Sequence, residues 1–257
     1  MENEFANKVA LITGATSGIG KATALRFGEA GAHIAAVGRN ESALTELRQR
    51  IEGAGSQFVA IQSDLSQEQE ADEVVAKTLE RFGGIDVLVN AAGHISNGTI
   101  ENTTLQSWDA MLEINLRAPF VLIQKAVASL IERRGSVVNV SSVTGLRAFP
   151  GVLAYCVSKA GLDQLTRCAA LELAATGVRV NAVNPGVVVT EIHKRGGMTN
   201  DAYETFLQHS KTTHPLGRVG QAAEVAELIF FLASNRASWI TGATYSIDGG
   251  RSQTCAR

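Results

Sequence analysis

Short apolar runs alternate with longer amphipathic segments along this chain of 257 residues. The runs are rich in Val, Ile and Ala, and several are apolar throughout, which is typical of strands buried on both faces of a sheet. The pattern predicts seven strands, at Val9–Thr13, His33–Val37, Phe58–Ile61, Ile85–Val89, Ser136–Val140, Arg179–Val183 and Thr244–Ile247.

The segments between these runs have helical spacing and enough residues for a crossover helix. They are Ala43–Glu52, Glu68–Phe82, Leu105–Arg133, Val152–Thr176 and Ala222–Ala233. Strands that alternate with helices form βαβ units, in which a parallel sheet is covered on both faces. The sequence therefore predicts a doubly wound α/β fold with a seven-stranded parallel sheet.

One long stretch, Gly186 to about Pro215, shows neither pattern and contains Gly196 and Gly197. Long irregular loops in compact domains are usually lids or binding loops. We expect this segment, about residues 186–215, to cover a substrate. No linker, repeat or low-complexity segment marks a second domain, so residues 1–257 are expected to form a single one.

Composition excludes several function classes. The chain is 45% hydrophobic with a net charge of −2, so it can bury a large core, and nothing suggests a nucleic-acid partner or an acidic membrane surface. The N-terminus lacks the basic-then-apolar pattern of a signal peptide, and we expect no run of the ~18 apolar residues of a membrane span. A cytoplasmic protein is expected.

The three cysteines, Cys156, Cys168 and Cys255, have no metal-type spacing. An odd number of cysteines without a secretion signal favours free thiols. We expect no disulfide and no metal site.

A glycine-rich turn follows the first predicted strand. Gly14, Gly18 and Gly20 lie between Val9–Thr13 and the helical stretch Lys21–Phe27. Glycines let the backbone turn tightly and approach a pyrophosphate, and a helix N-terminus offers free N–H groups to an anion. A plain tight connection is the alternative interpretation of such a turn.

Tyr155 and Lys159 are four residues apart, so they lie on one face of a helix. A free phenol titrates near a pKa of about 10, and a neighbouring ammonium favours its ionised form. Such a pair can transfer protons near neutral pH. The spacing alone also occurs by chance in many helices. A serine pair, Ser141 and Ser142, ends thirteen residues before Tyr155.

These motifs together resemble the short-chain dehydrogenase/reductase family, whose fold is Rossmann-type. The match runs from about Lys8 to Gly250, and the motifs look most like those of bacterial 3-oxoacyl-[acyl-carrier-protein] reductases. It rests on Thr13–Gly20, Asn90–Gly93, Asn115, Ser142, Tyr155–Lys159 and Asn184–Gly186.

The resemblance implies four catalytic residues. Tyr155 exchanges a proton with the substrate oxygen while a hydride passes between nicotinamide and carbonyl carbon. Ser142 orients the carbonyl, and the family spacing selects it over Ser141. Lys159 lowers the pKa of Tyr155 and holds the nicotinamide ribose, and Asn115 anchors a water that leads to Lys159.

The end of the second strand bears on the cofactor. Folds that bind NAD place a carboxylate there for the ribose hydroxyls, whereas a 2′-phosphate favours a guanidinium. This chain has Gly38 and then Arg39, which resembles family members that prefer NADP(H); NAD(H) is the alternative. Some NADP-preferring relatives carry a basic residue where this chain has Ser17. A solvated loop arginine is the simpler interpretation of Arg39.

Six predicted strand ends carry motif residues, and the carboxyl ends of parallel strands meet at one edge where ligands bind. Asp64 also has the pattern of a helix-start cap. The residues expected to contact the cofactor are Gly14, Thr16, Ser17, Gly18, Ile19, Gly20, Arg39, Asn40, Asp64, Leu65, Asn90, Ala91, Gly93, Tyr155, Lys159, Pro185, Gly186, Val188 and Thr190.

The expected substrate is a small carbonyl compound or secondary alcohol. Its candidate contacts are a mixture of polar and apolar residues: His94, Ser142, Arg147, Phe149, Leu153, Ile192 and His193. This mixture suits a keto acid, a sugar alcohol or a hydrophobic ketone.

The resemblance also bears on partners. Carrier-protein reductases dock their acidic carrier through arginines on two helices; Arg133 matches one of them, but Leu171 stands at the other position. Family members usually form homotetramers through the helices that carry Asn115 and Tyr155. The alternatives to ketone reduction are NAD-dependent oxidation of a sugar alcohol, a steroid or another secondary alcohol, a non-catalytic dinucleotide-binding module, and a lyase or epimerase.

Overall fold

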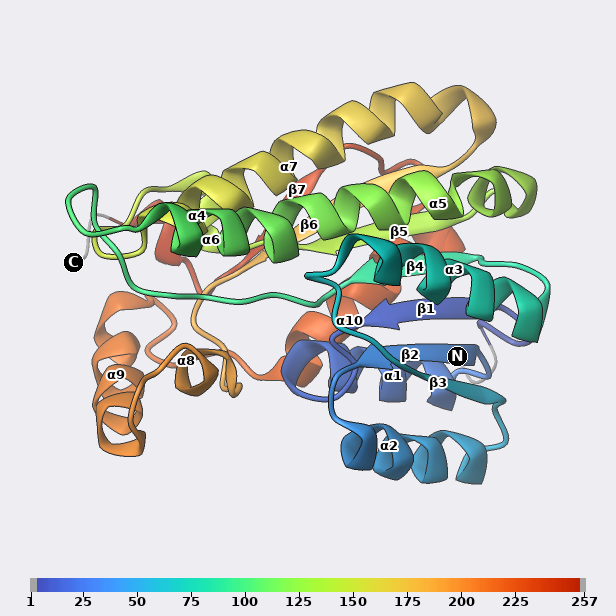
Figure 1. Cartoon of the computed structure of the whole chain (residues 1–257), viewed down its shortest axis with the longest axis horizontal. Coiled ribbons are helices and arrows are strands. Elements are labelled where there is room, and N and C mark those ends of the chain that lie inside the picture. The colour runs from blue at the N-terminus through green and yellow to red at the C-terminus, as the bar shows by residue number, and fades with distance from the viewer. Residues whose placement is uncertain (1–3, 255–257) are drawn as a thin grey trace.

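The protein is built around one parallel sheet of seven strands in the order β3-β2-β1-β4-β5-β6-β7 (Figure 1). The structure, a computed structural model, describes residues 4–254. The predicted doubly wound, Rossmann-type sheet is confirmed. Its strands are β1 (Val9–Thr13), β2 (His33–Gly38), β3 (Phe58–Gln62), β4 (Val87–Asn90), β5 (Ser136–Val140), β6 (Arg179–Pro185) and β7 (Thr244–Ile247).

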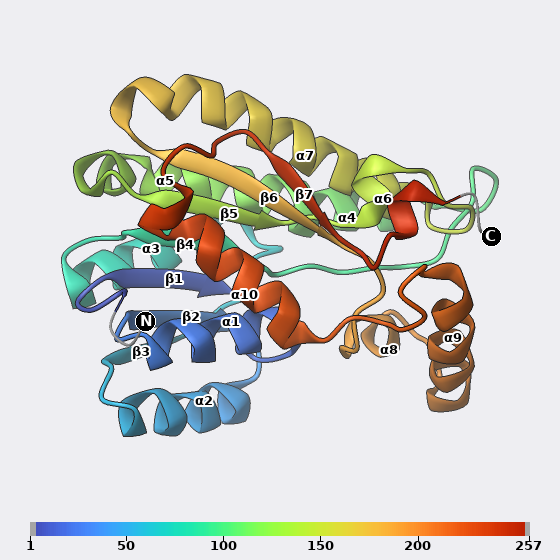
Figure 2. The ribbon, with the colours of Figure 1, turned by 180° about the vertical axis from the view of Figure 1, so that it is seen from behind.

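Helices cover both faces of the sheet, as Figures 1 and 2 show from opposite sides. One face carries α1 (Gly18–Glu29), α2 (Glu41–Gly53) and α10 (Ala222–Ala233). The other face carries α3 (Glu68–Phe82), α5 (Ala118–Arg133) and α7 (Leu153–Leu173). The remaining helices are α4 (Leu105–Leu112), α6 (Val143–Leu146), α8 (Ile192–Arg195), α9 (Asn200–Thr213), a π-helical turn at Glu113–Arg117, and 3₁₀ turns at Ala174–Thr176, Asn235–Ala237 and Arg251–Gln253.

The side chains of β1 explain why both faces are apolar. Successive side chains of a strand point to opposite faces. Ala10 and Ile12 are buried in the core under α1, α2 and α10, whereas Leu11 is buried in the core under α3, α5 and α7. A strand with two covered faces favours apolar side chains, which is why β1 is apolar from Val9 to Ile12 and polar only at its last residue, Thr13.

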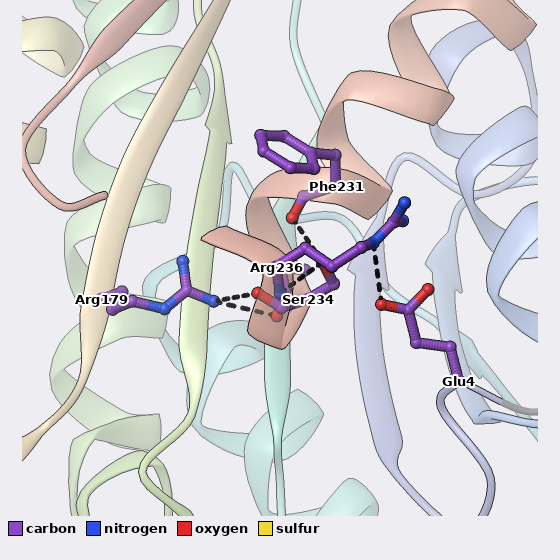
Figure 3. Close-up of polar contacts among 6 residues, drawn as sticks. Glu4, Arg179, Phe231, Ser234 and Arg236 are labelled. Atoms are coloured by element: carbon purple, nitrogen blue, oxygen red, sulfur yellow. Dashed lines mark hydrogen bonds and ion pairs between the residues drawn. The ribbon is translucent and has the colours of Figure 1, made fainter. Parts of the chain in front are cut away.

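The C-terminal end of α10 is held by a basic side chain from β6 (Figure 3). Arg179 donates hydrogen bonds to the carbonyl oxygens of Leu232 at 2.6 Å, Ala233 at 3.1 Å and Ser234 at 3.0 Å. The last carbonyls of a helix lack intrahelical donors, and the helix dipole favours a cation there. Arg179 therefore satisfies this helix end and ties α10 to the sheet.

The segment expected to be irregular contains two helices, so that expectation was wrong in this respect. Helix α8 is a single turn, and α9 begins after Thr199, whose hydroxyl accepts a hydrogen bond from the Ala202 N–H at 3.3 Å. Only Tyr203, Ser210 and Thr213 of α9 are buried. The polar residues of this segment, together with Gly196 and Gly197, had indicated a loop.

The helical stretch 105–133 corrects the expectation that no segment is long and apolar enough for a membrane span. By length and hydropathy alone it is apolar enough to cross a membrane, and 39% of its most apolar window is buried inside this structure. Its α5 part packs against α3, β4 and β5. A helix that covers a sheet satisfies the same test of length and hydropathy as a membrane span.

Two of the cysteines lie in the described part of the chain. Cys156 is half-buried and Cys168 is exposed, and both are free thiols. Cys255 lies outside the described residues.

Candidate active site

A cavity of about 590 Å³ opens at the carboxyl edge of the sheet. Residues after β1, β2, β3, β4, β5 and β6 line it, which is the convergence that the sequence predicted. The predicted cofactor contacts among the lining residues are Gly14, Thr16, Ser17, Gly18, Ile19, Gly20, Arg39, Asp64, Leu65, Ala91, Gly93, Tyr155, Lys159, Pro185, Gly186, Val188 and Thr190.

The turn after β1 leaves no room for side chains beyond hydrogen. Gly14 has φ +64°, and a Cβ there would lie 2.7 Å from the carbonyl oxygen of Ala91. A Cβ on Gly20 would overlap the carbonyl of Gly14. At Gly14, Gly18 and Gly20, which line the cavity, the surface is therefore backbone alone, and such a surface suits the close approach of a pyrophosphate to helix N–H groups.

The end of β2 also has the shape and charge for a phosphorylated ribose. A Cβ on Gly38 would overlap the Thr16 methyl group, so this backbone has no space for a carboxylate at that position. Arg39 follows and lines the cavity. These residues therefore fit a dinucleotide, and a cationic group stands where a 2′-phosphate needs one.

Tyr155 and Ser142 meet on the inner wall of the cavity. Tyr155 lies in the first turn of α7, and burial raises the pKa of its phenol to about 12, while a hydrogen bond with the Ser142 hydroxyl lowers it. Ser142 precedes α6 and also accepts a hydrogen bond from the Thr144 N–H at 3.1 Å. The structure thus places two hydroxyl groups side by side, where both can contact one carbonyl oxygen.

Lys159 lies one helical turn after Tyr155 and is 3% exposed. Its Nζ donates to the carbonyl oxygen of Val140 at 2.8 Å and lies 5.7 Å from the centre of the Tyr155 ring. Burial lowers the pKa of Lys159 to about 8, against a nearby carboxylate, Asp163, that raises it. In this arrangement the ammonium is directed to the end of β5 rather than to the phenol oxygen.

A buried polar network that the sequence analysis missed lies behind these residues. Asp163 is 1% exposed and accepts a hydrogen bond from Asn184 at 2.8 Å; Asn184 also donates to the carbonyl oxygen of Ser142 at 2.9 Å. Burial raises the pKa of Asp163, and hydrogen bonds with Ser141 and Asn184 lower it. Ser141 thus faces the protein interior, which leaves Ser142 as the serine at the phenol.

Asn115 lies in the π-helical turn between α4 and α5, a distortion frequent at functional sites. Its amide accepts from the His94 N–H at 3.0 Å and donates to the His94 carbonyl at 2.9 Å. A Cβ on Gly93 would lie 3.1 Å from Asn115 Oδ1 and 3.8 Å from Lys159 Nζ. Asn115 is therefore buried behind the wall at Gly93 and does not line the cavity itself.

The loop after β6 is fastened by a buried histidine that the sequence analysis left without a role. The Val187 N–H donates to Nε2 of His214 at 3.1 Å, so Nδ1 carries the proton and donates to the carbonyl of Ser210 at 2.7 Å. His214 is 3% exposed. It joins the end of α9 to the backbone that follows Gly186.

The far end of the cavity is mixed in character, as predicted. His94, Phe149, Ile192 and His193 line it together with Ser142. Burial lowers the pKa of His193, whose ring lies 4.6 Å from that of Phe206 on α9. Both helices of the segment 186–215 thus contribute side chains to this end.

Besides Asn115, four predicted residues lie outside the cavity, and each has a structural partner instead. Asn40 caps α2 by accepting from the Ala43 N–H at 3.0 Å. Asn90 is turned into the sheet, where it donates to Asn139 at 2.8 Å. The structure therefore does not bring the side chains of these two expected cofactor contacts to the cavity.

Arg147 and Leu153, expected at the substrate, are also absent from the cavity lining. Arg147 donates to the carbonyl oxygen of Thr254. Leu153 begins α7 and bonds through its N–H to the carbonyl of Gly98 at 3.1 Å. Asp64 lines the cavity and accepts from the Ser66 hydroxyl at 2.9 Å. This contact lies before α3 and does not cap it, because the N-cap residue of α3 is Gln67.

Known proteins are similar to this chain in sequence and in architecture. A family model described as enoyl-(acyl carrier protein) reductase matches residues 14–252. A 3-oxoacyl-[acyl-carrier-protein] reductase of Thermotoga maritima is 41% identical over 244 residues, which cover 95% of this chain and 97% of the relative. A short-chain dehydrogenase/reductase of unknown function from Caenorhabditis elegans, solved with cofactor, superposes with a TM-score of 0.93 at 36% identity over 98% of this chain and 97% of that one. The chain belongs to the short-chain dehydrogenase/reductase family.

Two further relatives agree with this membership. A 3-oxoacyl-[acyl-carrier-protein] reductase of Staphylococcus aureus is 37% identical over 95% of this chain and 97% of the relative. A blue fluorescent protein from a metagenomic library, solved in complex with NADPH, has a TM-score of 0.88 and 32% identity over 96% of this chain and 99% of that one. This short-chain dehydrogenase/reductase is an NAD(P)-dependent oxidoreductase.

Proposed function

We propose that this enzyme reduces a ketone with NADPH, and that its substrate is a 3-oxoacyl thioester. The observation that carries the proposal is that Ser142 and Tyr155 both line the cavity, with the Ser142 hydroxyl near enough to the Tyr155 phenol to lower its pKa. The names of the Thermotoga and Staphylococcus relatives support the choice of substrate.

The proton chemistry belongs to Tyr155. Its pKa of about 12 keeps the phenol protonated at neutral pH, so it can donate a proton to the oxygen of a carbonyl that is being reduced. Ser142 orients that oxygen by hydrogen bonding, because its own hydroxyl is fixed at the start of α6. Lys159 replaces the proton on Tyr155, and Asn115 supports this step from behind Gly93.

The cofactor residues are proposed from the shape of their surface. Backbone at Gly14, Gly18 and Gly20 receives the pyrophosphate, and Arg39 receives the 2′-phosphate. Lys159 holds the nicotinamide ribose, and the segment Pro185–Thr190 holds the carboxamide end. When bound, the nicotinamide supplies the hydride that adds to the carbonyl carbon.

Two side chains argue for a substrate that is not docked through a carrier protein. Arg133 donates to the carbonyl oxygen of Gly83 at 3.2 Å, and its guanidinium packs over Gly84. Leu171 is 82% exposed on α7 and offers no charge to an acidic partner. We therefore propose a thioester that enters as a small molecule, with His94, Phe149, Ile192 and His193 around its acyl part.

The test follows nicotinamide absorbance with an acetoacetyl thioester as substrate. NADPH oxidation by the wild type, with NADH much slower and Tyr155→Phe inactive but still able to bind NADPH, supports the proposal. Tyr155→Phe turnover above about a tenth of wild type contradicts the role of the phenol. Turnover of NAD with sugar alcohols, steroids or other secondary alcohols, without thioester reduction, favours the alternative function.

We also propose a cytoplasmic, single-domain subunit that assembles as a homotetramer. A shallow apolar hollow lies on the helices that carry Asn115 and Tyr155, and Leu112, Leu116, Phe120 and Leu165 line it together with Arg117. Exposed apolar surface of this kind is typical of interfaces. Light scattering at micromolar concentration tests the assembly, and a monomer would contradict it.

A further inference from the structure

Two arginines from distant parts of the chain face the same side of the cavity. Arg39 follows β2, and Arg195 is the last residue of α8; both line the cavity. Arg195 Nη1 donates a hydrogen bond to the hydroxyl of Ser17 at 3.0 Å. Since Ser17 precedes α1, this contact fastens α8 to the cofactor side of the cavity, where Figure 1 shows α8 beyond the carboxyl ends of the strands.

The charges of this region are not balanced. The pKa of Arg195 is lowered first by burial and then by the charge of Arg39, and Glu191 opposes this with a smaller effect. Glu191 itself lies 3.8 Å from Lys194 Nζ. The pKa of His94 is likewise lowered by burial and by both arginines. Within the described part of the chain, neither Arg39 nor Arg195 has an ion pair with a carboxylate.

The main chain fixes the position of α8, and the hydrogen bond to Ser17 holds the side chain of Arg195. A Cβ on Gly196 would lie 2.5 Å from the carbonyl oxygen of Ile95, which means that the end of α8 packs directly on this backbone. The Gly196 N–H bonds to the carbonyl of Ile192 at 3.0 Å. Two guanidiniums that line one cavity, neither with a carboxylate partner, repel each other, and an anion between them would relieve that repulsion.

We propose that Arg195 acts together with Arg39 to bind the 2′-phosphate of NADP. The inference rests on the proposed NADPH use and adds a residue from the segment 186–215 to it. A phosphate accepts several charge-assisted hydrogen bonds, and guanidiniums are suited to give them in pairs. The pyrophosphate has its own donors in the first turn of α1. The 2′-phosphate is the anion that belongs at the end of β2, where Arg39 stands.

This arrangement couples cofactor choice to the substrate side. A phosphate held from both β2 and α8 keeps α8 against Ser17, and α8 carries Ile192 and His193 at the substrate end of the cavity. NADP therefore orders part of the substrate pocket, whereas NAD lacks the group that Arg195 contacts.

The test is a binding measurement on the full-length protein. NADPH and NADH are titrated by calorimetry into wild type, Arg195→Gln, Arg39→Gln and Lys194→Gln, with circular dichroism to verify folding. Lys194 is the matched control, since it lies on the same turn and pairs with Glu191. We expect Arg195→Gln to weaken NADPH binding about tenfold and NADH binding less than about twofold, with Lys194→Gln close to wild type.

Two results would overturn the inference. Equal weakening of NADPH and NADH would assign Arg195 to the pyrophosphate, and an unchanged affinity for NADPH would leave it as a contact of Ser17 alone. Neither result depends on turnover. If the wild type binds NADPH but does not reduce the thioester, the proposed substrate is wrong, and the affinities alone still decide this inference. If the wild type binds neither cofactor, both the proposed function and this inference are wrong.

Discussion

The phenol of Tyr203 bonds to both main-chain polar groups of Thr190. Its oxygen accepts from the Thr190 N–H at 3.2 Å and donates to the Thr190 carbonyl at 2.8 Å. Tyr203 is on α9 and is 3% exposed, and a Cβ on Gly18 would lie 2.9 Å from the Thr190 methyl. The helix over the substrate end thus positions a residue against the glycine turn of the cofactor side.

Tyr203→Phe is expected to loosen this connection. It removes two hydrogen bonds and leaves the groups of Thr190 without that partner, at a cost of about 1–3 kcal/mol in the free energy of unfolding. Hydrogen exchange of α9 should accelerate more than that of β1. Tyr245→Phe on β7 is the control. Equal protection of α9 in wild type and Tyr203→Phe would show that the phenol does not hold this segment.

The charged form of Lys159, which catalysis needs, lowers the free energy of unfolding. At neutral pH a buried ammonium with a pKa lowered to about 8 is charged at a cost of about 3 kcal/mol, partly offset by its hydrogen bond to Val140. Lys159→Met should therefore be inactive yet more stable than wild type at pH 7, by about 1–2 kcal/mol in urea unfolding.

The same comparison depends on pH in a defined direction. Because the folded-state pKa of Lys159 is lowered, the unfolded chain binds more protons between about pH 8 and the usual lysine value of 10.5, so wild-type stability rises with pH in that window. The advantage of Lys159→Met should shrink between pH 7 and pH 9.5. Lys125→Met, on the exposed side of α5, should show a constant difference. A stability difference between Lys159→Met and wild type that grows with pH would contradict the lowered pKa of Lys159.

Asp163 is expected to act on catalysis through Lys159. Its carboxylate raises the pKa of Lys159 against burial. Asp163→Asn keeps the shape but removes the charge, so the pKa of Lys159 should fall further and the pH profile of kcat should move to lower pH, with KM for NADPH little changed. Asp109→Asn on α4 serves as the surface control. If Asp163→Asn lowers kcat equally at every pH and its pH profile does not shift from that of wild type, Asp163 supports only the fold.

The strands were predictable because strands buried on both faces are nearly continuous apolar runs. β1, β5 and β7 have their predicted bounds, and the others differ at their ends. Helix α9 was not predicted, because its residues are mostly polar and follow Gly196 and Gly197, and only three of its side chains are buried. Its start had a signal in Thr199, a residue that favours N-caps.

Some residues of the candidate site had a signal in the sequence and others had none. Ser142 and Tyr155 were predicted together because their spacing matches that of the family which the chain resembles. Asp163 had a weaker signal, four residues after Lys159 on one helix face. Arg195 had none, because its contact with Ser17 joins segments 178 residues apart and depends on how α8 packs. Local sequence patterns do not predict tertiary contacts of this kind.

Arg179 should contribute to stability far more than a neighbouring arginine that has an ion pair. Arg179 bonds to the last carbonyls of α10, whereas Arg236 pairs with Glu4 at 3.0 Å at the surface (Figure 3). Arg179→Gln leaves partly buried carbonyls without donors and should cost about 2–3 kcal/mol in urea unfolding. Arg236→Gln removes an ion pair whose partners are 47% and 22% exposed, and should cost less than about 1 kcal/mol. Similar losses for the two variants would mean that the end of α10 is stabilised by its packing on β6 and not by the guanidinium.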